Sequence, residues 1–463
     1  MASNAHAQDV DNGQRLYQSQ CAGCHSRDLT GGYGPNLIDD TWLHGSTRGG
    51  IREVITQGVP GTGMPSFKHT LNEEQVNHII DYLIHMRTSS STSHIPSLQS
   101  PIETLDYAIK VEEFVSGLEI PWALEFTDTH TALITERAGR LRIVERGRLR
   151  EQPIADTPTV YHPPQAQGGL LDIVLHPDFN NNGWVYLAYT EALEKNANEE
   201  HPPSMLRIVR GKIRNYRWVE QEDIFVAPQK TYTTTPPYHY GSRMVFDEHG
   251  YLFFSVGDRY AQDQAQDLQR PNGKIHRVHD DGKIPVDNPF VKRANALASI
   301  YSYGHRHPQG MAIHPQTGEI WAAEHGPKGG DELNRLVAGG NYGWPIISYG
   351  INYDGSVLTP HRQQQGMQQP VRYWRPSIAT SGVAFYEGKL FPRWQNKLLL
   401  GALKDEVLLL LDIQDGRVIH EESLLKNQGR VREAVVGPEG AVYVILDEPA
   451  RIVRLTAEKE RLL

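Results

Sequence analysis

Cysteine is scarce in this chain, since its 463 residues include only Cys21 and Cys24. A structural zinc site needs four ligands, and the absence of a second cysteine pair argues against one. Long apolar runs are also missing, and none reaches the roughly 18 residues that a membrane-spanning helix requires. The sequence therefore predicts no transmembrane helix. The cysteine pair is either a redox couple or a cofactor attachment site.

An excess of basic charge is likewise missing. The formal net charge is -9, and acidic residues are spread without long runs. No basic stripe marks a surface for nucleic acid, so nucleic acid is not expected as a main partner. With 39% hydrophobic and 22% charged residues, the chain has the composition of a globular protein. Its length allows two or three domains.

The two cysteines form the run Cys-Ala-Gly-Cys-His, which ends at His25. This spacing is the attachment signature of a c-type haem. It predicts thioether bonds to Cys21 and Cys24, with His25 as one iron ligand. The chain is therefore expected to move electrons.

The N-terminus lacks an apolar signal-peptide core. The residues Ala5-His6-Ala7 resemble the end of a cleaved signal, with cleavage before Gln8. Because haem is attached covalently outside the bacterial cytoplasm in most systems, we expect a periplasmic or secreted protein whose signal peptide has been removed.

The second haem ligand is expected from a loop that contains Met64. Glycines around it let the backbone approach the haem, and Pro65 stiffens the turn that presents the sulfur. A thioether ligand raises the haem potential, which suits an electron acceptor. His44 and His69 are the alternatives, and either would give two histidine ligands.

Residues 8–87 are predicted to form one small all-α unit. One helix is expected to run into the haem motif over 11–20, and a second covers 71–87, where Asn72 and Gln75 make a capping box. The apolar residues of the second helix recur at helical spacing and should face the haem pocket: Val76, Ile79, Ile80 and Leu83. The whole unit resembles the class I cytochromes c. Residues 88–102 are rich in Ser, Thr and Pro and are predicted to form a flexible tether.

The remainder of the chain, 103–463, repeats one pattern of an apolar strand, a turn and a second apolar strand. Six copies begin near residues 121, 171, 242, 309, 381 and 432. About 60 residues per copy is enough for a four-stranded blade with its loops. We therefore predict an all-β six-bladed β-propeller, with a pair of β-sandwiches as the alternative. Propellers bind ligands on loops from several blades, so functional residues should be scattered along the chain.

Dense polar motifs mark the predicted blade junctions. They include Gln167-Gly168-Gly169, His239-Tyr240-Gly241-Ser242-Arg243, Gly257-Asp258-Arg259, Gly304-His305-Arg306-His307, Glu324-His325-Gly326-Pro327, Asn341-Tyr342-Gly343-Trp344, Leu403-Lys404 and Arg430-Val431-Arg432. Together and in this order they resemble the soluble aldose sugar dehydrogenases that depend on pyrroloquinoline quinone (PQQ), which are glucose dehydrogenase-like six-bladed propellers. The resemblance covers nearly all of 103–463.

The resemblance assigns roles residue by residue. His239 matches the base that takes the proton of the sugar's anomeric hydroxyl, and Asp258 matches the carboxylate that orients and stabilises its imidazole. Cations match the groups that bind the three carboxylates of PQQ, since Arg pairs with carboxylates in a bidentate way. These cations are Arg306, Lys404, Arg430 and Arg432. Arg306 is also assigned to the catalytic residues. Gln167 matches an amide contact of the cofactor. Arg430 and Arg432 should share one face of a strand.

Calcium is also implied by the resemblance. Gly326 and Pro327 match the backbone carbonyls that hold a Ca²⁺ ion, which polarises the quinone carbonyl as a Lewis acid. Glu332 and the carbonyl of Tyr342 resemble part of a second Ca²⁺ site. One position departs from the family, because His307 stands where the pattern usually has Asn. That position lies beside the cofactor, so the resemblance does not determine its hydrogen bonds or the substrate preference.

The resemblance implies an enzyme that oxidises the C1 hydroxyl of an aldose to a lactone by hydride transfer to PQQ, and then passes electrons to the fused haem. The downstream acceptor stays open. Two alternatives remain. A Ca²⁺-dependent lactonase on the same fold would not need the cations Lys404, Arg430 and Arg432. A non-catalytic, haem-tethered sugar-binding propeller would show no haem reduction by sugar.

Overall fold

The computed structural model describes residues 2–27, 29, 31, 34–38, 42, 45, 47–60, 62–89, 98–163, 166–197 and 199–461. The chain divides into two compact units. The first comprises 1–96 with the short segments 164–166 and 351–358, and the second comprises the rest. Within the described residues, no helix is both long and apolar enough to cross a membrane.

The first unit is helical. Its helices are α1 (Ala2–Gln20), α2 (Ala22–His25), α3 (Arg48–Gln57) and α4 (Glu73–Ser89). The predicted capping box is confirmed: Asn72 and Gln75 exchange hydrogen bonds of 2.9 Å between each backbone N–H and the other's side-chain oxygen. The predicted apolar stripe of α4 is also confirmed, since Val76, Ile79, Ile80 and Leu83 are all buried in the core.

Two predicted boundaries of this unit differ from the structure. Helix α1 begins at Ala2 rather than at Asp11, and α4 continues to Ser89. Residues 90–97 of the predicted tether lie outside the described residues. The described end of the tether is fixed locally, because the backbone N–H of Gln99 donates to Oε1 of Gln428 at 3.0 Å.

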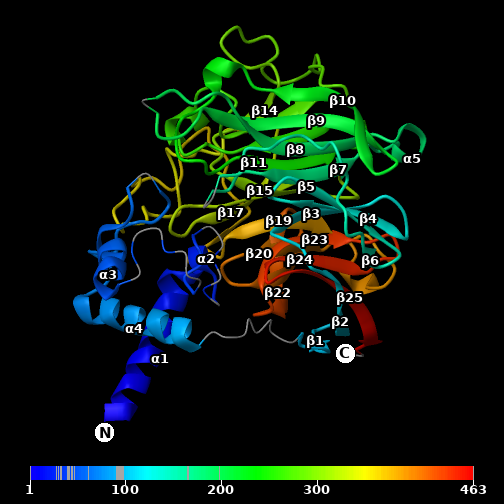
Figure 1. Ribbon diagram of the computed structural model, residues 1–463. Coiled ribbons are helices and arrows are strands. Elements are labelled where there is room, and N and C mark those ends of the chain that lie inside the picture. The colour runs from blue at the N-terminus through cyan, green and yellow to red at the C-terminus, as the bar shows by residue number, and fades with distance from the viewer. Residues whose placement is uncertain are drawn as a thin grey trace. The chain divides into compact units, whose positions relative to one another are not determined.

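The second unit is a six-bladed β-propeller, as predicted. In its described residues the strands form six antiparallel sheets (Figure 1). The first two are β3 (Pro121–Phe126), β4 (Thr131–Glu136), β5 (Arg140–Glu145) and β6 (Arg148–Leu149), then β7 (Leu170–Leu175), β8 (Val185–Ala192), β9 (Ser204–Arg214) and β10 (Arg217–Val226). The third and fourth are β11 (Gly241–Phe246), β12 (Leu252–Val256), β13 (Lys274–Val278) and β14 (Ile300–Tyr303), then β15 (Pro308–Ile313), β16 (Ile320–Glu324), β17 (Asp331–Arg335) and β18 (Arg372–Trp374).

The fifth sheet is β19 (Thr380–Phe385), β20 (Leu398–Ala402), β21 (Val407–Gln414) and β22 (Arg417–Lys426). The sixth joins both ends of the propeller sequence: β1 (Ile102–Glu103), β2 (Tyr107–Ser116), β25 (Ala450–Glu460), β24 (Val442–Glu448) and β23 (Arg430–Val436). Figure 1 shows this closure as cyan β2 beside red β25. Short helical turns lie in the loops at α5 (Phe179–Asn182), η1 (Gln229–Thr231), η2 (Gln262–Ala265) and η3 (Pro392–Trp394).

The six repeated sequence units are the innermost strands β3, β7, β11, β15, β19 and β23. Each contacts the next in order, and β23 contacts β3, which closes the ring. Apolar side chains pack between neighbouring sheets, as where Trp321 meets Phe385 and Leu400. Each fully buried side chain of this size contributes about 1.5–3 kcal/mol. These interfaces between blades are the core of the propeller.

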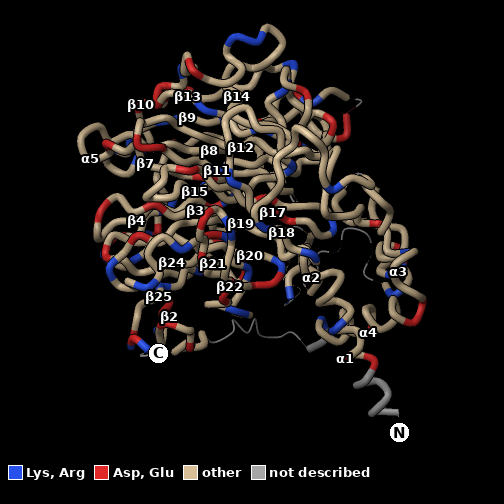
Figure 2. Tube along the Cα trace, turned by 180° about the vertical axis from the view of Figure 1, so that it is seen from behind, with Lys and Arg blue, Asp and Glu red and all other residues tan. Residues whose placement is uncertain are grey.

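Charge is distributed evenly over the fold. Figure 2 shows acidic and basic residues interspersed along the described chain. This agrees with the absence of charge runs in the sequence.

Candidate active site

The site residues gather at one end of the innermost strands. All six strands have an irregular register near their first residues, as in β11 between Gly241 and Met244 and in β15 between Pro308 and Gly310. A β-bulge bends a strand and redirects its side chains. Hydroxyl groups of the second strands stabilise these bends: Oγ of Ser255, for example, accepts the N–H of Arg243 at 3.0 Å. The bulges therefore direct the loops before each strand toward a shared centre.

His239 and Asp258 form a buried dyad at this centre. Nδ1 of His239 lies 2.7 Å from Oδ1 of Asp258, and both residues are at least nine-tenths buried. The backbone N–H of His239 donates to Oε1 of Gln167 at 2.8 Å, which links the predicted amide residue to the loop of the base. Because Nδ1–H donates to the carboxylate, the lone pair of the imidazole stands on Nε2. This is the tautomer that a general base needs.

The electrostatics of the dyad favour a neutral imidazole. Burial and the positive charge of Arg306 lower the pKa of His239 below 6.5, although Asp258 acts in the opposite direction. The pKa of Asp258 is lowered, because the attraction of His239 and Arg306 outweighs its burial. The dyad therefore holds a proton acceptor ready at neutral pH.

Two partners of the dyad were not assigned from the sequence. The indole Nε1–H of Trp344 donates to Oδ2 of Asp258 at 2.8 Å. The backbone N–H of Tyr260 donates to Oδ1 of the same carboxylate at 2.9 Å, and its ring lies 5.2 Å from that of His239. Arg259 and Tyr260 both have a positive φ, of 56° and 60°. Such strained backbone is typical of functional sites, and here it turns the Tyr260 N–H back onto the aspartate.

Arg306 lies against the same centre. Its backbone N–H donates to Oε2 of Glu324 at 2.8 Å, and its Nη1 donates to the carbonyls of His325 and Gly326 at 3.1 and 2.7 Å. Its guanidinium lies 5.3 Å from the ring centre of Trp344. Its Nε is buried with no hydrogen-bond partner. A ligand could therefore satisfy at least one donor of Arg306.

Arg430 and Arg432 contact the same carboxylate from β24, as expected for residues that share a face. Nε of Arg430 lies 3.3 Å from Oδ1 of Asp447, and Nη2 of Arg432 lies 2.7 Å from Oδ2. Arg432 also covers the ring of Trp122, with 4.0 Å to the ring centre. Asp447 was missed by sequence reasoning, since an acidic residue in a strand gives no motif. Lys404 stands apart from this pair, and its Nζ donates to the carbonyl of Ser377 at 3.1 Å.

Asp331 links the Lys404 region to the predicted calcium loop. One of its oxygens accepts the N–H of Gly326 at 2.9 Å, and the other accepts from Ser377 and from the N–H groups of Ile378 and Ala379. Burial raises the pKa of Asp331 in spite of these bonds. The carboxylate therefore fixes two backbone segments, the one at Gly326 and the one at Ile378 and Ala379.

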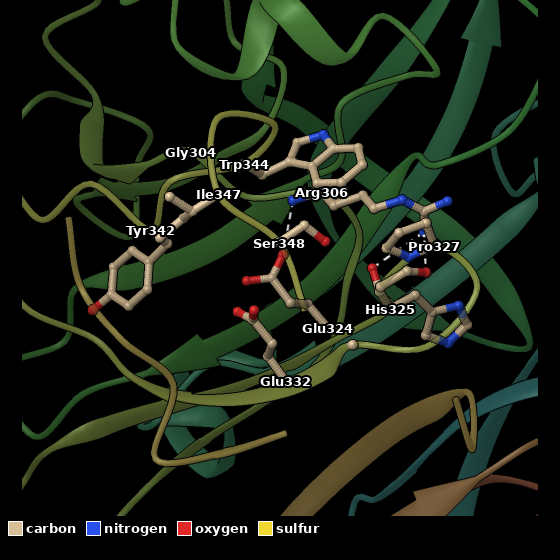
Figure 3. A pocket seen from close by; sticks show the side chains of 12 residues that line it. Gly304, Arg306, Glu324, His325, Pro327, Glu332, Tyr342, Trp344, Ile347 and Ser348 are labelled. Carbon is tan, nitrogen blue, oxygen red and sulfur yellow. Dashed lines mark hydrogen bonds between the residues drawn. The ribbon is translucent and has the colours of Figure 1, made fainter. Parts of the chain in front are cut away.

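A small cavity of about 20 Å³ brings together all four residues that the sequence predicted for calcium. Gly326, Pro327, Glu332 and Tyr342 line it, together with Glu324. Figure 3 shows the carboxylates of Glu324 and Glu332 pointing toward one another. The sequence assigned two separate ions, whereas the structure places both residue pairs around one cavity.

The donor set of this cavity fits a hard cation. Burial and the negative charge of Glu324 raise the pKa of Glu332 to about 8, so a cation in this cavity would stabilise the ionised form of both carboxylates. The volume is about that needed for one water-sized occupant. Among the described residues, no group of three His, Cys, Asp or Glu side chains is arranged to hold a metal. Backbone carbonyls would have to complete the coordination, as Ca²⁺ accepts. Glu324 was missed, although its motif was noted.

The haem motif lies in the first unit at the end of α1. Nδ1 of His25 lies 3.0 Å from the carbonyl of Pro35, so this nitrogen donates and Nε2 is left for an iron ligand. The hydroxyl of Tyr17 donates to the carbonyls of His25 and Ser26, at 3.0 and 2.7 Å. Burial lowers the pKa of His25, which keeps the imidazole neutral. These contacts orient the histidine for a metal.

The candidates for the second haem ligand differ in their surroundings. Met64 is half-buried and packs against the apolar core that contains Cys21. His69 is exposed, which disfavours it, and His44 lies outside the described residues. The structure therefore favours Met64 over His69.

Comparisons with known proteins agree with this architecture. Residues 118–454 match the glucose / sorbosone dehydrogenase family, and 8–83 match the family of the cbb3-type cytochrome c oxidase subunit III. The chain is 40% identical over 356 residues to the aldose sugar dehydrogenase YliI of Escherichia coli strain K12, which covers 76% of this chain and 93% of that protein.

Solved structures give the same result. A glucose dehydrogenase crystal structure superposes with a TM-score of 0.70 at 38% identity, covering 76% of this chain and 99% of that one. The PQQ-bound form of the aldose sugar dehydrogenase from Streptomyces coelicolor superposes with a TM-score of 0.60 at 25% identity, covering 76% and 98%. The chain therefore belongs to the glucose / sorbosone dehydrogenase family, with a cytochrome c domain at its N-terminal end.

Proposed function

We propose that this protein is a quinohaemoprotein that oxidises the C1 hydroxyl of aldose sugars to lactones with PQQ and Ca²⁺, and that its own haem c receives the electrons. The His239–Asp258 dyad carries the proposal, because it places an oriented, neutral base within a shell of cations. A lactonase would have no use for the buried cations Arg430 and Arg432. The PQQ named in the Streptomyces structure supports the same cofactor here.

The fit of PQQ can be tested on the residues themselves. PQQ is a flat quinone with three carboxylates, and it needs cations and planar surfaces. Buried donors without hydrogen-bond partners are present on the cations and imidazoles of the site, at Nε of Arg306, Nε of Arg432 and Nδ1 of His307. Unpaired buried donors cost about 1–3 kcal/mol each, and native sites seldom leave them so. An anionic, oxygen-rich ligand is the chemistry that would satisfy them.

The roles of the protein groups follow from the geometry. When bound, PQQ would supply an electrophilic quinone carbonyl as the hydride acceptor for the sugar C1. Nε2 of His239 accepts the proton of the C1 hydroxyl, and Asp258 stabilises the imidazolium that forms. Trp344 and the Tyr260 N–H hold that carboxylate in place. Arg306, Lys404, Arg430, Arg432 and Gln167 would hold the cofactor, and the carbonyls of Gly326 and Pro327 would hold Ca²⁺.

The cavity lined by Gly326, Pro327, Glu332 and Tyr342 is proposed to hold a cation through Glu332 and the carbonyl of Tyr342, with Glu324 as an additional ligand. This cation would neutralise two facing carboxylates. It would also fix Glu324, which accepts the backbone N–H of Arg306. The bound metal ion would thus stabilise the loop that carries Arg306.

The haem unit is proposed to act as the built-in acceptor, held by Cys21 and Cys24 with His25 and Met64 on the iron. We assign the cytochrome domain to the helical unit that ends with α4 at Ser89, the propeller to the chain from β1 at Ile102 onward, and the tether to the residues between them. A short tether raises the effective concentration of the acceptor. Covalent haem attachment supports a periplasmic or secreted location.

One experiment tests the whole proposal. The full chain with haem attached is reconstituted with PQQ and Ca²⁺, and haem absorbance is followed during titration with a panel of aldoses. Reduction of the haem is expected only when PQQ, Ca²⁺ and an aldose are all present. A chain that binds PQQ but shows no sugar-dependent reduction of haem or of a redox dye would be a binding protein. Lactone hydrolysis without PQQ would point to a lactonase.

A further inference from the structure

His307 stands between two other histidines in the centre of the site. Its ring stacks on that of His239 with 4.8 Å between ring centres and meets the ring of His325 at 5.3 Å, edge to face. It is 2% exposed. Burial lowers its pKa well below 6.5, any charge on the neighbouring His239 or His325 would lower it further, and the guanidinium groups of Arg306 and Arg432 act in the same direction. A neutral imidazole carries one ring proton, and the neighbours decide which nitrogen has it.

Gln309 contacts one of the two ring nitrogens. Its Nε2 lies 2.9 Å from Nε2 of His307. The orientation of the amide is determined by its other contacts. Its oxygen accepts from Nη1 of Arg432 at 3.2 Å, and a guanidinium can only donate. Its nitrogen lies 3.3 and 3.4 Å from the carbonyls of Gly241 and Pro308, which can only accept. The amide nitrogen therefore faces His307 as a donor.

Two consequences follow for His307. Its Nε2 must accept the amide hydrogen bond, so the ring proton stands on Nδ1. An imidazolium would present a second donor to the Gln309 amide, which disfavours the charged form for a reason independent of burial. Nδ1–H is then a buried donor, and it has no hydrogen-bond partner in the described chain. Such a group calls for an acceptor from a ligand.

We propose that Arg432 and Gln309 fix His307 as the Nδ1–H tautomer, so that His307 donates one hydrogen bond to a ligand oxygen. This inference rests on the proposed function for the identity of the ligand, but not for the tautomer. The acceptor is a carbonyl or hydroxyl oxygen, from the quinone or from the sugar. Gln309 is a positioning residue, because it acts through His307.

The proposal gives the stacked pair opposite roles. In His239, Asp258 contacts Nδ1, and the remaining nitrogen, Nε2, carries a lone pair. In His307, Gln309 contacts Nε2, and the remaining nitrogen, Nδ1, carries a proton. One ring can thus accept the substrate proton while the other stabilises an oxygen on which negative charge develops. An Asn at this position would offer an amide donor, so His307 would preserve the donor while adding a ring that stacks on the base.

The first test reads the tautomer directly by NMR of the full chain with haem attached and histidines labelled with ¹⁵N. A protonated ring nitrogen and one with a lone pair have well-separated ¹⁵N signals. His276 is an internal reference of the opposite kind, because its Nε2 donates to the carbonyl of Pro271 at 3.0 Å and its Nδ1 accepts from Ser299 at 2.9 Å. His307→Asn identifies the His307 signals.

The expected result is a proton on Nδ1 of His307 at pH 7.5. In Gln309→Glu a carboxylate oxygen faces Nε2, so the proton should move to Nε2 or the ring should become charged. The same change at the exposed Gln316, Gln316→Glu, should leave the His307 signals in place. A wild-type His307 protonated on Nε2, or charged, overturns the proposal.

The second test measures what the donor binds. Asn and Leu have nearly the same size and shape, but only Asn donates, so His307→Asn and His307→Leu form a matched pair. PQQ affinity is measured by titration in the presence of Ca²⁺ without sugar, and the sugar KM is measured separately. One hydrogen bond corresponds to about a tenfold difference. A quinone acceptor predicts about tenfold weaker PQQ binding in His307→Leu than in His307→Asn.

A sugar acceptor predicts equal PQQ affinity in the pair and about a tenfold higher KM in His307→Leu. Equal affinities and equal KM values would refute the donor role even if the tautomer is as proposed. Failure of the wild-type protein to bind PQQ would instead refute the proposed function, and the NMR result would be unaffected. The two ideas can therefore fail separately.

Discussion

The indole N–H of Trp344 and the imidazole Nδ1–H of His239 donate to different oxygens of one carboxylate, that of Asp258, at 2.8 and 2.7 Å. The two donors come from the loops before β11 and after β17, far apart in the chain. They leave the carboxylate little freedom to rotate. The imidazole is therefore held in one tautomer.

Asp258→Asn should lower kcat by about 10²–10⁴-fold, because an amide can also donate to Nδ1 and thereby place the ring proton on Nε2. The fold should be retained, since the side chains have the same shape. The measurement is dye-linked sugar oxidation after reconstitution. Asp263→Asn, at an exposed position in the following turn, is the matched control and should retain activity. Wild-type kcat in Asp258→Asn would remove the dyad from the mechanism.

The pH dependence of kcat/KM should have an acid limb with a midpoint below 6.5. His239 acts as a base only when deprotonated, and burial and the charge of Arg306 lower its pKa. The rate should thus be level near neutral pH and fall as the imidazole becomes protonated. Because Asp258 raises this pKa, Asp258→Asn should move the residual acid limb to lower pH. A limb that moves to higher pH would contradict this assignment.

Met64→Ala should lower the haem reduction potential and slow haem reduction by sugar, because a thioether ligand raises the potential. Dye-linked activity of the propeller should stay near the wild-type value. Met86→Ala removes another methionine that packs against the same core and should leave the potential within a few millivolts of its starting value, on the order of measurement error. Loss of dye-linked activity in Met64→Ala would argue against two separable modules.

Removal of Ca²⁺ by a chelator should lower the melting temperature, since a ligand that binds only the folded state stabilises it by RT ln(1 + [L]/Kd). Glu332→Gln removes one charge from the cavity and should reduce the stabilisation by added Ca²⁺. Glu319→Gln, on the surface of the same blade, should respond to Ca²⁺ as the wild type does. An equal response of all three proteins would place the cation elsewhere.

The sequence was a good guide where local chemistry decides structure. Short sequence patterns predicted the capping box of α4 and the six inner strands, and the structure has both at the predicted residues. The haem motif is likewise a short local pattern. The dyad was found through a family resemblance. Its residues meet because they continue the antiparallel register of β11 and β12 two positions beyond Gly241 and Val256, and no sequence pattern revealed that register. Asp447, Gln309 and Glu324 were missed although each contacts a partner within its own blade, because a single polar residue in a strand gives no recognisable motif. The resemblance assigned Gly326 and Pro327 to one calcium ion and Glu332 and Tyr342 to another, whereas the fold places all four residues around one cavity.

The innermost strands of the propeller carry a cluster of ion-paired residues. Arg243 of β11 donates to Asp172 of β7 at 2.8 Å and also pairs with Glu433 of β23. Glu125 of β3 lies near both acids, so a third carboxylate adds its negative charge to this cluster. Burial and the charges of Glu433 and Asp172 raise the pKa of Glu125 to about 8. The same burial raises the pKa of Glu433 to about 7, in spite of Arg243.

A raised carboxyl pKa means that the folded protein keeps a proton that the unfolded chain releases. Between the ordinary value of 4.5 and about 8, stability should therefore decrease as the pH rises. Glu125→Gln cannot ionise, so it should lose less stability over this range and be the more stable protein at pH 9, by on the order of 1–3 kcal/mol. Urea unfolding at pH 5, 7 and 9 measures the effect, with the exposed Glu151→Gln as control. Parallel pH profiles for the wild type and Glu125→Gln would show that Glu125 is ionised in the folded state.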